Sequence, residues 1–162
     1  MAKVIIALGS NLNEPHQQLK EAHSFLSSLS STDIISSSIY KSEPVGPSEQ
    51  DFLNAVVVIQ SDLSPTALFK QLKNQEKEQG RPSRYPKWTS RTIDLDIIAY
   101  DDLVLETDTL IIPHAEYKNR LFVLNPLREV LPEWKDVRDA QHIEEMISNA
   151  PQIRIKKTKL AW

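Results

Sequence analysis

The sequence predicts an α+β fold with a βαββαβ core, in which an antiparallel sheet carries two helices on one face. Two observations lead to this prediction. Short runs of apolar and β-branched residues are typical of strands. These runs span residues 3–8, 32–41, 52–60 and 92–100. Longer stretches with apolar residues at helical spacing lie between them, at 14–29 and 65–79. This order of elements is the split βαβ arrangement of ferredoxin-like domains.

Turn and capping residues delimit the first elements of this core. Gly9-Ser10-Asn11 follows the first apolar run and ends the first strand. Asn13 is placed to cap the first helix, which has Pro15 in its first turn. After the second strand, residues 42–50 contain two prolines and a glycine, which predicts a loop.

The second helix has a signal at each end. Ser64 supplies a capping hydroxyl, and Pro65 occupies the first helical position, where its missing N–H costs nothing. Gly80 is placed as the C-terminal stop of this helix. Residues 81–91 then form a polar loop with two prolines before the last core strand.

The remainder of the chain predicts a less regular C-terminal extension. Residues 103–112 contain short apolar pieces that predict one hairpin, and residues 119–130 predict a helix interrupted by Pro126. Apolar residues over 143–147 predict a short helix. Residues 153–160 are compatible with a final strand or with a solvated basic tail. No second domain boundary is visible, so we expect one domain.

Composition limits the function classes. The chain has 162 residues, no cysteine and only three glycines, Gly9, Gly46 and Gly80. This excludes disulfides and thiolate chemistry, and it excludes glycine-rich phosphate loops, which need glycines close together. The 19 basic and 22 acidic residues give a net charge of −3, which argues against a surface that binds nucleic acid throughout. Without a secretion signal or a long apolar segment, we expect a cytoplasmic protein that contacts no membrane.

Asp94 and Asp96 form the sharpest local feature. They alternate with Leu95 inside an apolar strand, so both carboxylates point to one face with their Cα atoms roughly 6.5–7 Å apart. Two neighbouring carboxylates repel each other unless a positive group joins them, and Mg²⁺ is commonly held by one or two carboxylates plus phosphate oxygens. The alternative is a strand whose polar face meets water.

A basic loop directly precedes this strand. Residues 80–91 carry Arg81, Arg84, Lys87 and Arg91 and no acidic residue. Arginine can bind phosphate oxygens with two parallel hydrogen bonds, so cationic side chains here can replace a glycine-rich phosphate loop. The alternatives are a solvated basic loop and a contact with nucleic acid.

Three further residues are candidates for ligand contacts. His114 can contact a phosphate or a nucleotide, or it can be a packing residue. Phe52 and Asn54 begin the third strand on one face, where a ring and an amide can recognise a heterocycle. Phe52 taken alone is also compatible with the core.

Six motifs in order along the chain resemble those of one family. They are GSNL at 9–12, SEPVG at 42–46, FLNA at 52–55, RTIDLDII at 91–98, PH at 113–114 and NRLFVLNPL at 119–127. Together they resemble the 6-hydroxymethyl-7,8-dihydropterin pyrophosphokinases of folate biosynthesis. The resemblance implies a ferredoxin-like core, a monomer, two Mg²⁺ ions, and transfer of pyrophosphate from ATP to the pterin hydroxymethyl group, which leaves AMP.

The resemblance also implies roles for individual residues. It places the metal ions on Asp94 and Asp96, which are catalytic together with Arg81 and Arg91. The residues implied for pterin binding are Ser42, Glu43, Val45, Phe52, Asn54, Trp88 and Phe122. The residues implied for ATP binding are Glu76, Arg81, Arg84, Trp88, Arg91, Ile97, His114 and Arg120.

The chain departs from the family pattern at three positions. Thr89 stands where a glycine is usual, Ser83 stands where a second loop arginine is usual, and Ala115 replaces a proline or an aromatic residue. These departures leave one rival, a module that binds a nucleotide or pterin without catalysis. An RNA-binding domain of the same fold requires a K/R-G-F/Y-G/A-F segment, which the sequence lacks.

Overall fold

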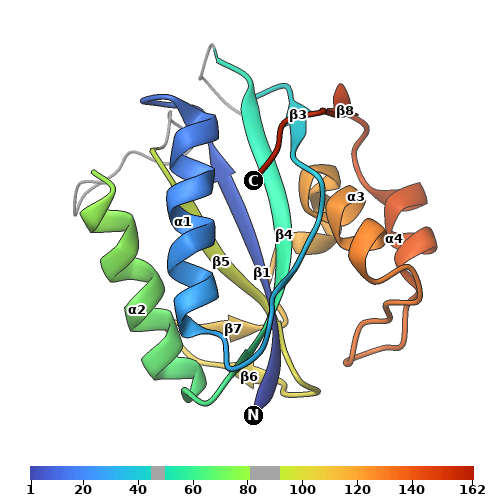
Figure 1. Ribbon diagram of the computed structural model, residues 1–162. Helices are drawn as coiled ribbons and strands as arrows, with labels where there is room; N and C mark the ends of the chain where they lie inside the picture. The colour runs from blue at the N-terminus through green and yellow to red at the C-terminus, as the bar shows by residue number, and fades with distance from the viewer. Residues whose placement is uncertain (45–49, 81–91) are drawn as a thin grey trace.

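One antiparallel sheet runs through the computed structural model, which describes residues 1–44, 50–80 and 92–162 (Figure 1). The first half of the chain contains β1 (Ala2–Ser10), α1 (Pro15–Leu29), β2 (Ile35–Ser36), β3 (Tyr40–Ser42), β4 (Phe52–Ser61) and α2 (Pro65–Glu78). The second half contains β5 (Asp94–Tyr100), β6 (Leu105–Glu106), β7 (Ile111–Ile112), the 3₁₀ turn η1 (Tyr117–Asn119), α3 (Leu121–Val130), α4 (Ile143–Asn149) and β8 (Ile155–Lys157).

The strands lie in the order β5-β1-β4-β3-β8, with each neighbouring pair antiparallel. β2 pairs with β4 beside this path, and β6 and β7 form a separate hairpin, as predicted for residues 103–112. The chain therefore forms a mixed α/β structure in which β1 and β4 lie at the centre of the main sheet. Their apolar runs reflect this position, because a central strand is covered on both faces.

Helices cover both faces of the sheet, whereas the sequence placed them on one face. Figure 1 shows α1 and α2 on one side of the sheet and α3 and α4 on the other. Along β1, Val4, Ile6 and Leu8 pack with α1 and α2, while Ile5 and Ala7 pack with α3 and α4. The two core helices lie as predicted, and the C-terminal extension buries the second face. The sequence predicted helices over 119–130 and 143–147 but did not predict which face of the sheet they cover.

The predicted strand over 32–41 is divided into β2 and β3. Ser37 lies between them and bonds to Val56 twice: its N–H donates to the Val56 carbonyl at 2.9 Å, and its hydroxyl accepts the Val56 N–H at 3.0 Å. The hydroxyl therefore replaces a backbone carbonyl as acceptor, which interrupts the regular ladder. Periodicity alone does not distinguish such a residue from an ordinary strand position.

The helix boundaries confirm most of the expected caps. The Ser64 hydroxyl accepts the Ala67 N–H at 3.2 Å, and Gly80 follows α2 with a φ of 105°, a left-handed conformation that suits glycine. The prediction that Asn13 caps α1 is wrong. Asn13 itself has a φ of 55°, and the cap position falls on Glu14, whose side chain makes no capping hydrogen bond. A side-chain cap requires an extended backbone at that residue.

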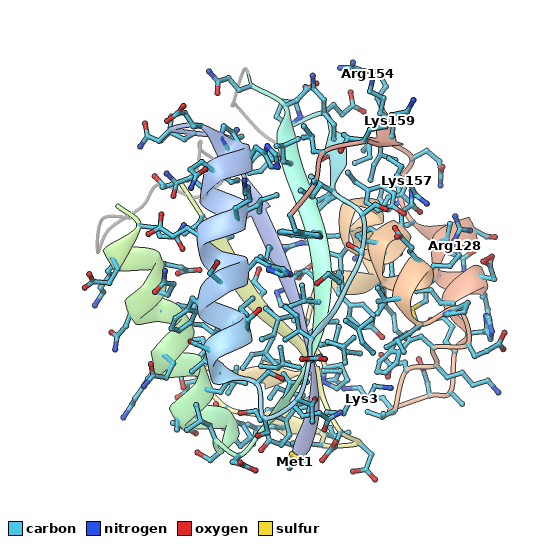
Figure 2. All side chains as sticks on the ribbon, in the orientation of Figure 1. Met1, Lys3, Arg128, Arg154, Lys157 and Lys159 are labelled. Atoms are coloured by element: carbon cyan, nitrogen blue, oxygen red, sulfur yellow. The ribbon has the colours of Figure 1, made fainter. Side chains whose placement is uncertain are left out.

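The C-terminal elements resolve two further expectations. α3 continues through Pro126, which the sequence predicted would interrupt it, because buried neighbours such as Leu124 and Leu127 anchor the helix on the sheet. The segment 153–160 forms β8, which pairs with β3 and extends the sheet. Figure 2 shows its cations Arg154, Lys157 and Lys159 on the far side of the molecule from α2. The basic tail is therefore separate from the surface that α2 and β5 share.

Candidate active site

The two aspartates of β5 lie on one face of the sheet, as their spacing predicts. Asp94 pairs with Gly9 and Asp96 with Ala7 of β1, in an unbroken register. Leu95 between them is fully buried in the core that faces α1 and α2. The Asp96 side chain is 34% exposed, so it is accessible to a ligand while its backbone is held in the sheet.

Gly9 connects these aspartates to the residues expected to bind a heterocycle. Directly opposite Gly9 lie Asp94 on one side and Asn54 on the other. Residues paired across neighbouring strands share a face, and strands are about 4.8 Å apart. Asp94 and Asn54 therefore face the same side about 10 Å apart, roughly two strand spacings. A Cβ atom at Gly9 would lie 3.4 Å from the Asn54 Oδ1 atom. The lack of a side chain at Gly9 therefore leaves space between Asn54 and Asp94.

Asn54 is held by a buried hydrogen bond. Its Nδ2 donates to the Ser42 hydroxyl at 2.8 Å, and only 3% of the residue is exposed. Phe52 lies two positions earlier on the same strand and is half-buried. Glu43, next to Ser42, is tied to β8, because its N–H donates to the Arg154 carbonyl and its carboxylate accepts the Arg154 N–H at 2.8 Å. The structure thus brings Ser42, Phe52 and Asn54 together.

A pocket of about 320 Å³ lies beside Asp96. Its wall contains the metal candidate Asp96 and three of the eight residues implied for ATP binding, namely Ile97, His114 and Arg120. Phe69, Leu110 and Ile111 add apolar surface that the sequence did not identify. A pocket with an apolar wall and a few charged groups suits a ligand that combines a flat ring with phosphates.

Two cations flank the Asp96 carboxylate. The Lys73 Nζ lies 3.9 Å from its Oδ1, and the Arg120 Nη1 lies 4.0 Å from its Oδ2. The Arg120 guanidinium also lies 5.9 Å from the centre of the Phe122 ring, which places Phe122 next to this group. Sequence reasoning missed Lys73, because its place on α2 marks only a helix surface. Its relation to Asp96 depends on how α2 packs against β5.

Glu76 is buried against the backbone of β5. Its Oε2 accepts the Leu95 N–H at 2.8 Å and the Lys73 ammonium at 3.1 Å, and 2% of the residue is exposed. The sequence suggested that Glu76 contacts the nucleotide. The structure places this carboxylate on the backbone between Asp94 and Asp96, where it holds the strand, and a contact with the nucleotide stays a prediction.

Comparison with known proteins identifies the family. Residues 5–132 match the family model described as 7,8-dihydro-6-hydroxymethylpterin-pyrophosphokinase (HPPK). The chain belongs to this family.

Curated relatives of the HPPK family cover nearly the whole chain. A Haemophilus influenzae 2-amino-4-hydroxy-6-hydroxymethyldihydropteridine pyrophosphokinase is 46% identical over 80% of this chain and 82% of its own length. A Pseudomonas aeruginosa protein of the same name is 36% identical over 92% of each chain.

Solved structures match at the level of the fold. A Plasmodium falciparum HPPK-DHPS crystal structure with pteroate gives a TM-score of 0.70 at 14% identity and covers 91% of this chain. An HPPK-DHPS complex with substrates gives 0.69 at 15% identity. The chain spans less than half the length of these structures, 44% and 43% respectively. Within the described residues, no helix is long and apolar enough to cross a membrane.

His114 occupies the pocket of this HPPK chain as a neutral side chain. Its backbone N–H donates to the Ile98 carbonyl at 2.9 Å, and its ring Nδ1 accepts the backbone N–H of Glu116 at 3.0 Å. Burial lowers the pKa of His114, and the nearby Asp96 carboxylate only partly opposes this effect. A neutral imidazole can donate or accept one hydrogen bond without adding charge to the pocket.

The lowered pKa of His114 predicts a pH-dependent stability. When the pH falls below 6.5, the ordinary pKa of histidine, His114 takes up a proton in the unfolded chain more readily than in the folded chain. The free energy of unfolding should therefore fall as the pH drops below about 6.5, and His114→Gln should reduce this slope. Urea denaturation at several pH values measures both. An equal slope in the variant would contradict the assignment of a neutral, buried His114.

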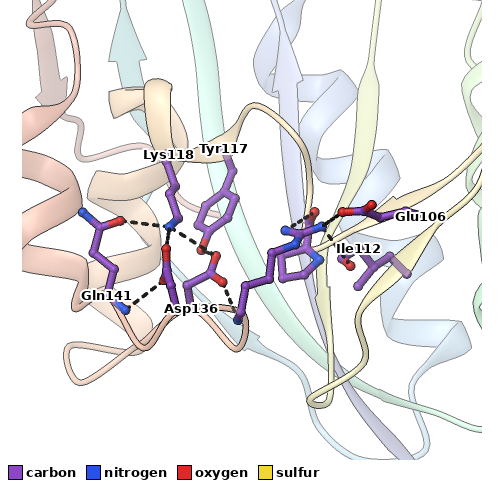
Figure 3. A network of polar contacts seen from close by, with 9 residues as sticks. Glu106, Ile112, Tyr117, Lys118, Asp136 and Gln141 are labelled. Carbon is purple, nitrogen blue, oxygen red and sulfur yellow. Dashed lines mark hydrogen bonds and ion pairs between the residues drawn. The ribbon is translucent and has the colours of Figure 1, made fainter.

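A polar network holds the segment that carries His114 (Figure 3). The Arg138 guanidinium donates to the carbonyls of Ile112 and Pro113 at 3.3 and 3.0 Å. Asp136 is 2% exposed. Its carboxylate accepts the backbone N–H of Arg138 at 2.7 Å and the hydroxyl of Tyr117. Burial raises the pKa of Tyr117, so this hydroxyl remains a donor. Asp136 and Arg138 lie beyond residues 5–132, the region matched by the family model, whereas Ile112, Pro113 and Tyr117 lie within it.

Removal of the carboxylate at the centre of this network should destabilise the fold. Asp136→Ala leaves the buried Tyr117 hydroxyl without its acceptor, and we expect a loss of about 3 kcal/mol in the free energy of unfolding. Urea denaturation measures it. Glu144→Ala is the control, because Glu144 forms an exposed ion pair with Arg128 and its loss should cost less than about 1 kcal/mol. Equal losses in the two variants would contradict a structural role for the network.

The remaining site predictions lie outside the described residues. They are Val45, Arg81, Arg84, Trp88 and Arg91, together with the departures at Ser83 and Thr89. Among residues 1–44, 50–80 and 92–162, no group of three or more His, Asp or Glu side chains is placed to hold a metal ion.

Proposed function

We propose that this chain transfers pyrophosphate from ATP to the hydroxymethyl group of 6-hydroxymethyl-7,8-dihydropterin, forming the pterin diphosphate and AMP. Its membership of the HPPK family carries the proposal. The arrangement around Gly9 supports it, because Asn54 and Asp94 face one side of neighbouring strands. A substrate bound at Asn54 can then reach a phosphate group held at the aspartates.

Pterin recognition falls to the residues around the start of β4. The Asn54 amide can both donate to and accept from the edge of a pterin ring, and its bond to Ser42 holds it in one orientation. Phe52 and Phe122 would enclose the ring from its two faces, and Glu43 would present backbone groups to its edge. The roles of Val45 and Trp88 in this site remain part of the proposal.

Asp94 and Asp96 would hold Mg²⁺, and we propose two ions. The two carboxylates suit a metal ion because they lie on one face of the sheet. Asp96 is also a third exposed and lines a pocket. Hard oxygen donors of this kind suit Mg²⁺ together with phosphate oxygens. Bound there, the metal would neutralise phosphate charge and lower the pKa of the attacking hydroxyl. The aspartates themselves provide fixed negative charge at a defined place on a rigid strand.

ATP would occupy the pocket beside Asp96. Arg120 is placed to bind phosphate oxygens, His114 can donate one hydrogen bond, and Ile97 contributes to the wall. We further propose phosphate contacts for Arg81, Arg84 and Arg91, and a closing role for Trp88 in their loop. Glu76 supports this site through the β5 backbone. Phosphoryl transfer depends mainly on such positioning and charge compensation.

We also infer the topology of the fold, the number of domains, the oligomeric state and the cellular compartment. The order β5-β1-β4-β3 of the core strands supports a ferredoxin-like arrangement within a single domain. A monomeric, cytoplasmic protein is consistent with a small substrate and an ATP-dependent reaction. These features stay proposals that size-exclusion chromatography and cell fractionation can test.

The proposed reaction predicts a defined set of products. With ATP, the hydroxymethyl pterin and Mg²⁺, the protein should produce AMP, and production should stop when either the pterin or Mg²⁺ is omitted. Liquid chromatography separates AMP from ADP. Measurable pterin binding without AMP formation would instead support a module that binds its ligand without catalysis.

A further inference from the structure

Two side chains of α2 complete the free edge of β5 in the described sheet. β5 is the terminal strand of the order β5-β1-β4-β3-β8. The backbone N–H and carbonyl of Leu95 that point away from β1 therefore need hydrogen-bond partners outside the sheet. Glu76 accepts the Leu95 N–H, and the Lys73 Nζ donates to the Leu95 carbonyl at 3.3 Å. The Lys73 ammonium is therefore held at the peptide group between the two aspartates.

This position directs the ammonium toward Asp96. Lys73 lies 3.1 Å from Glu76 and 3.9 Å from the Asp96 Oδ1, with its Nζ 5.4 Å from the centre of the Phe69 ring. Phe69 and Asp96 both line the pocket. The side chain of Lys73 is 32% exposed, so its charge is partly desolvated and its interaction with Asp96 is only partly screened.

We propose that Lys73 is a resident counter-ion of Asp96 that lowers the affinity of the nucleotide-free pocket for free divalent metal. The inference rests on the proposed function, in which Asp96 holds the metal. A metal ion that approaches without nucleotide meets the Lys73 ammonium on one side of Asp96 and the Arg120 guanidinium on the other. It must overcome the repulsion of both cations.

ATP changes this balance because it brings negative charge into the same pocket. The phosphates attract the Lys73 ammonium, and its repulsion of the metal is then compensated. Lys73 thus favours the entry of metal together with nucleotide over the entry of metal alone. It acts through Asp96 as a positioning residue, and its effect on metal affinity should largely disappear when a nucleotide is bound.

The test is the affinity of the nucleotide-free protein for Mn²⁺, measured by electron paramagnetic resonance. Lys73→Met should bind Mn²⁺ about fivefold more tightly than the wild type, the change expected from losing a partly exposed ion pair. Lys73→Arg, which keeps the charge, should resemble the wild type. Lys70→Met is the matched control, because Lys70 lies exposed one turn earlier on α2 and should leave the affinity unchanged.

Repeating the titration with α,β-methylene ATP tests this compensation. In its presence, Lys73→Met should bind Mn²⁺ within about twofold of the wild type, because the phosphates neutralise the Lys73 charge. An unchanged or lower Mn²⁺ affinity of nucleotide-free Lys73→Met would overturn the proposal. Asp96→Asn separates this failure from that of the proposed function: if Asp96→Asn also binds Mn²⁺ like the wild type, the metal assignment itself is wrong.

Discussion

Asp96→Asn is expected to lower kcat by about 10³-fold or more. Loss of a group that stabilises charge in the transition state typically has an effect of this size. The amide is nearly isosteric with the carboxylate but carries no charge, so the metal and the phosphates lose their compensation at this position. Asp96 is a third exposed and its backbone is paired with Ala7 in the sheet, so its replacement should leave the fold intact. Steady-state rates of AMP formation measure the effect.

Asp102→Asn provides the control for this experiment. Asp102 is an exposed acidic residue just beyond the end of β5, so its replacement makes the same change of charge outside the pocket. We expect its kcat to equal that of the wild type. A kcat for Asp96→Asn within tenfold of the wild type would remove Asp96 from the metal site.

Asn54→Ala is expected to weaken pterin binding by about 10²-fold. The substitution removes both the donor and the acceptor that the Asn54 amide would offer to the heterocycle. The substitution also leaves the Ser42 hydroxyl without its donor, although Ser42 can turn toward a water molecule. Affinity for ATP should stay within about twofold, since the nucleotide pocket does not include Asn54. Calorimetric titration with each substrate measures the two affinities separately.

Leu53→Val is the matched control on the same strand. Leu53 alternates with Asn54, and its side chain packs in the core that faces α1 and α2, on the opposite face of β4. It should alter stability and leave pterin affinity unchanged. Equal losses of pterin affinity in the two variants would show that Asn54→Ala acts through the fold and would contradict direct recognition.

Alternation along single strands was sufficient to predict part of the site. The placement of Asp94 and Asp96 on one face follows from the period of a strand, and so does that of Phe52 and Asn54. The relation between these two pairs could not be predicted in the same way. It depends on the register that places Gly9 opposite both Asn54 and Asp94, which is set by packing over the whole length of β1.

The elements that sequence reasoning missed depend on tertiary contacts. Lys73 follows an ordinary helical pattern, and only the packing of α2 against β5 places it, together with Glu76, at the strand edge. The coverage of the second sheet face by α3 and α4 was hidden for a similar reason. The sequence predicted both helices, but it did not show that their apolar residues cover the second sheet face, where they pack against Ile5, Val56 and their neighbours.

The identity of the nucleotide product tests the central proposal most directly. A reaction of the wild type with ATP, 6-hydroxymethyl-7,8-dihydropterin and Mg²⁺ should yield AMP and the pterin diphosphate in equal amounts, with the pterin product heavier by two phosphate groups in mass spectrometry. This result follows from transfer of the β- and γ-phosphates as one unit. Formation of ADP with a pterin monophosphate, or of neither product while both substrates bind, would contradict the proposed pyrophosphoryl transfer.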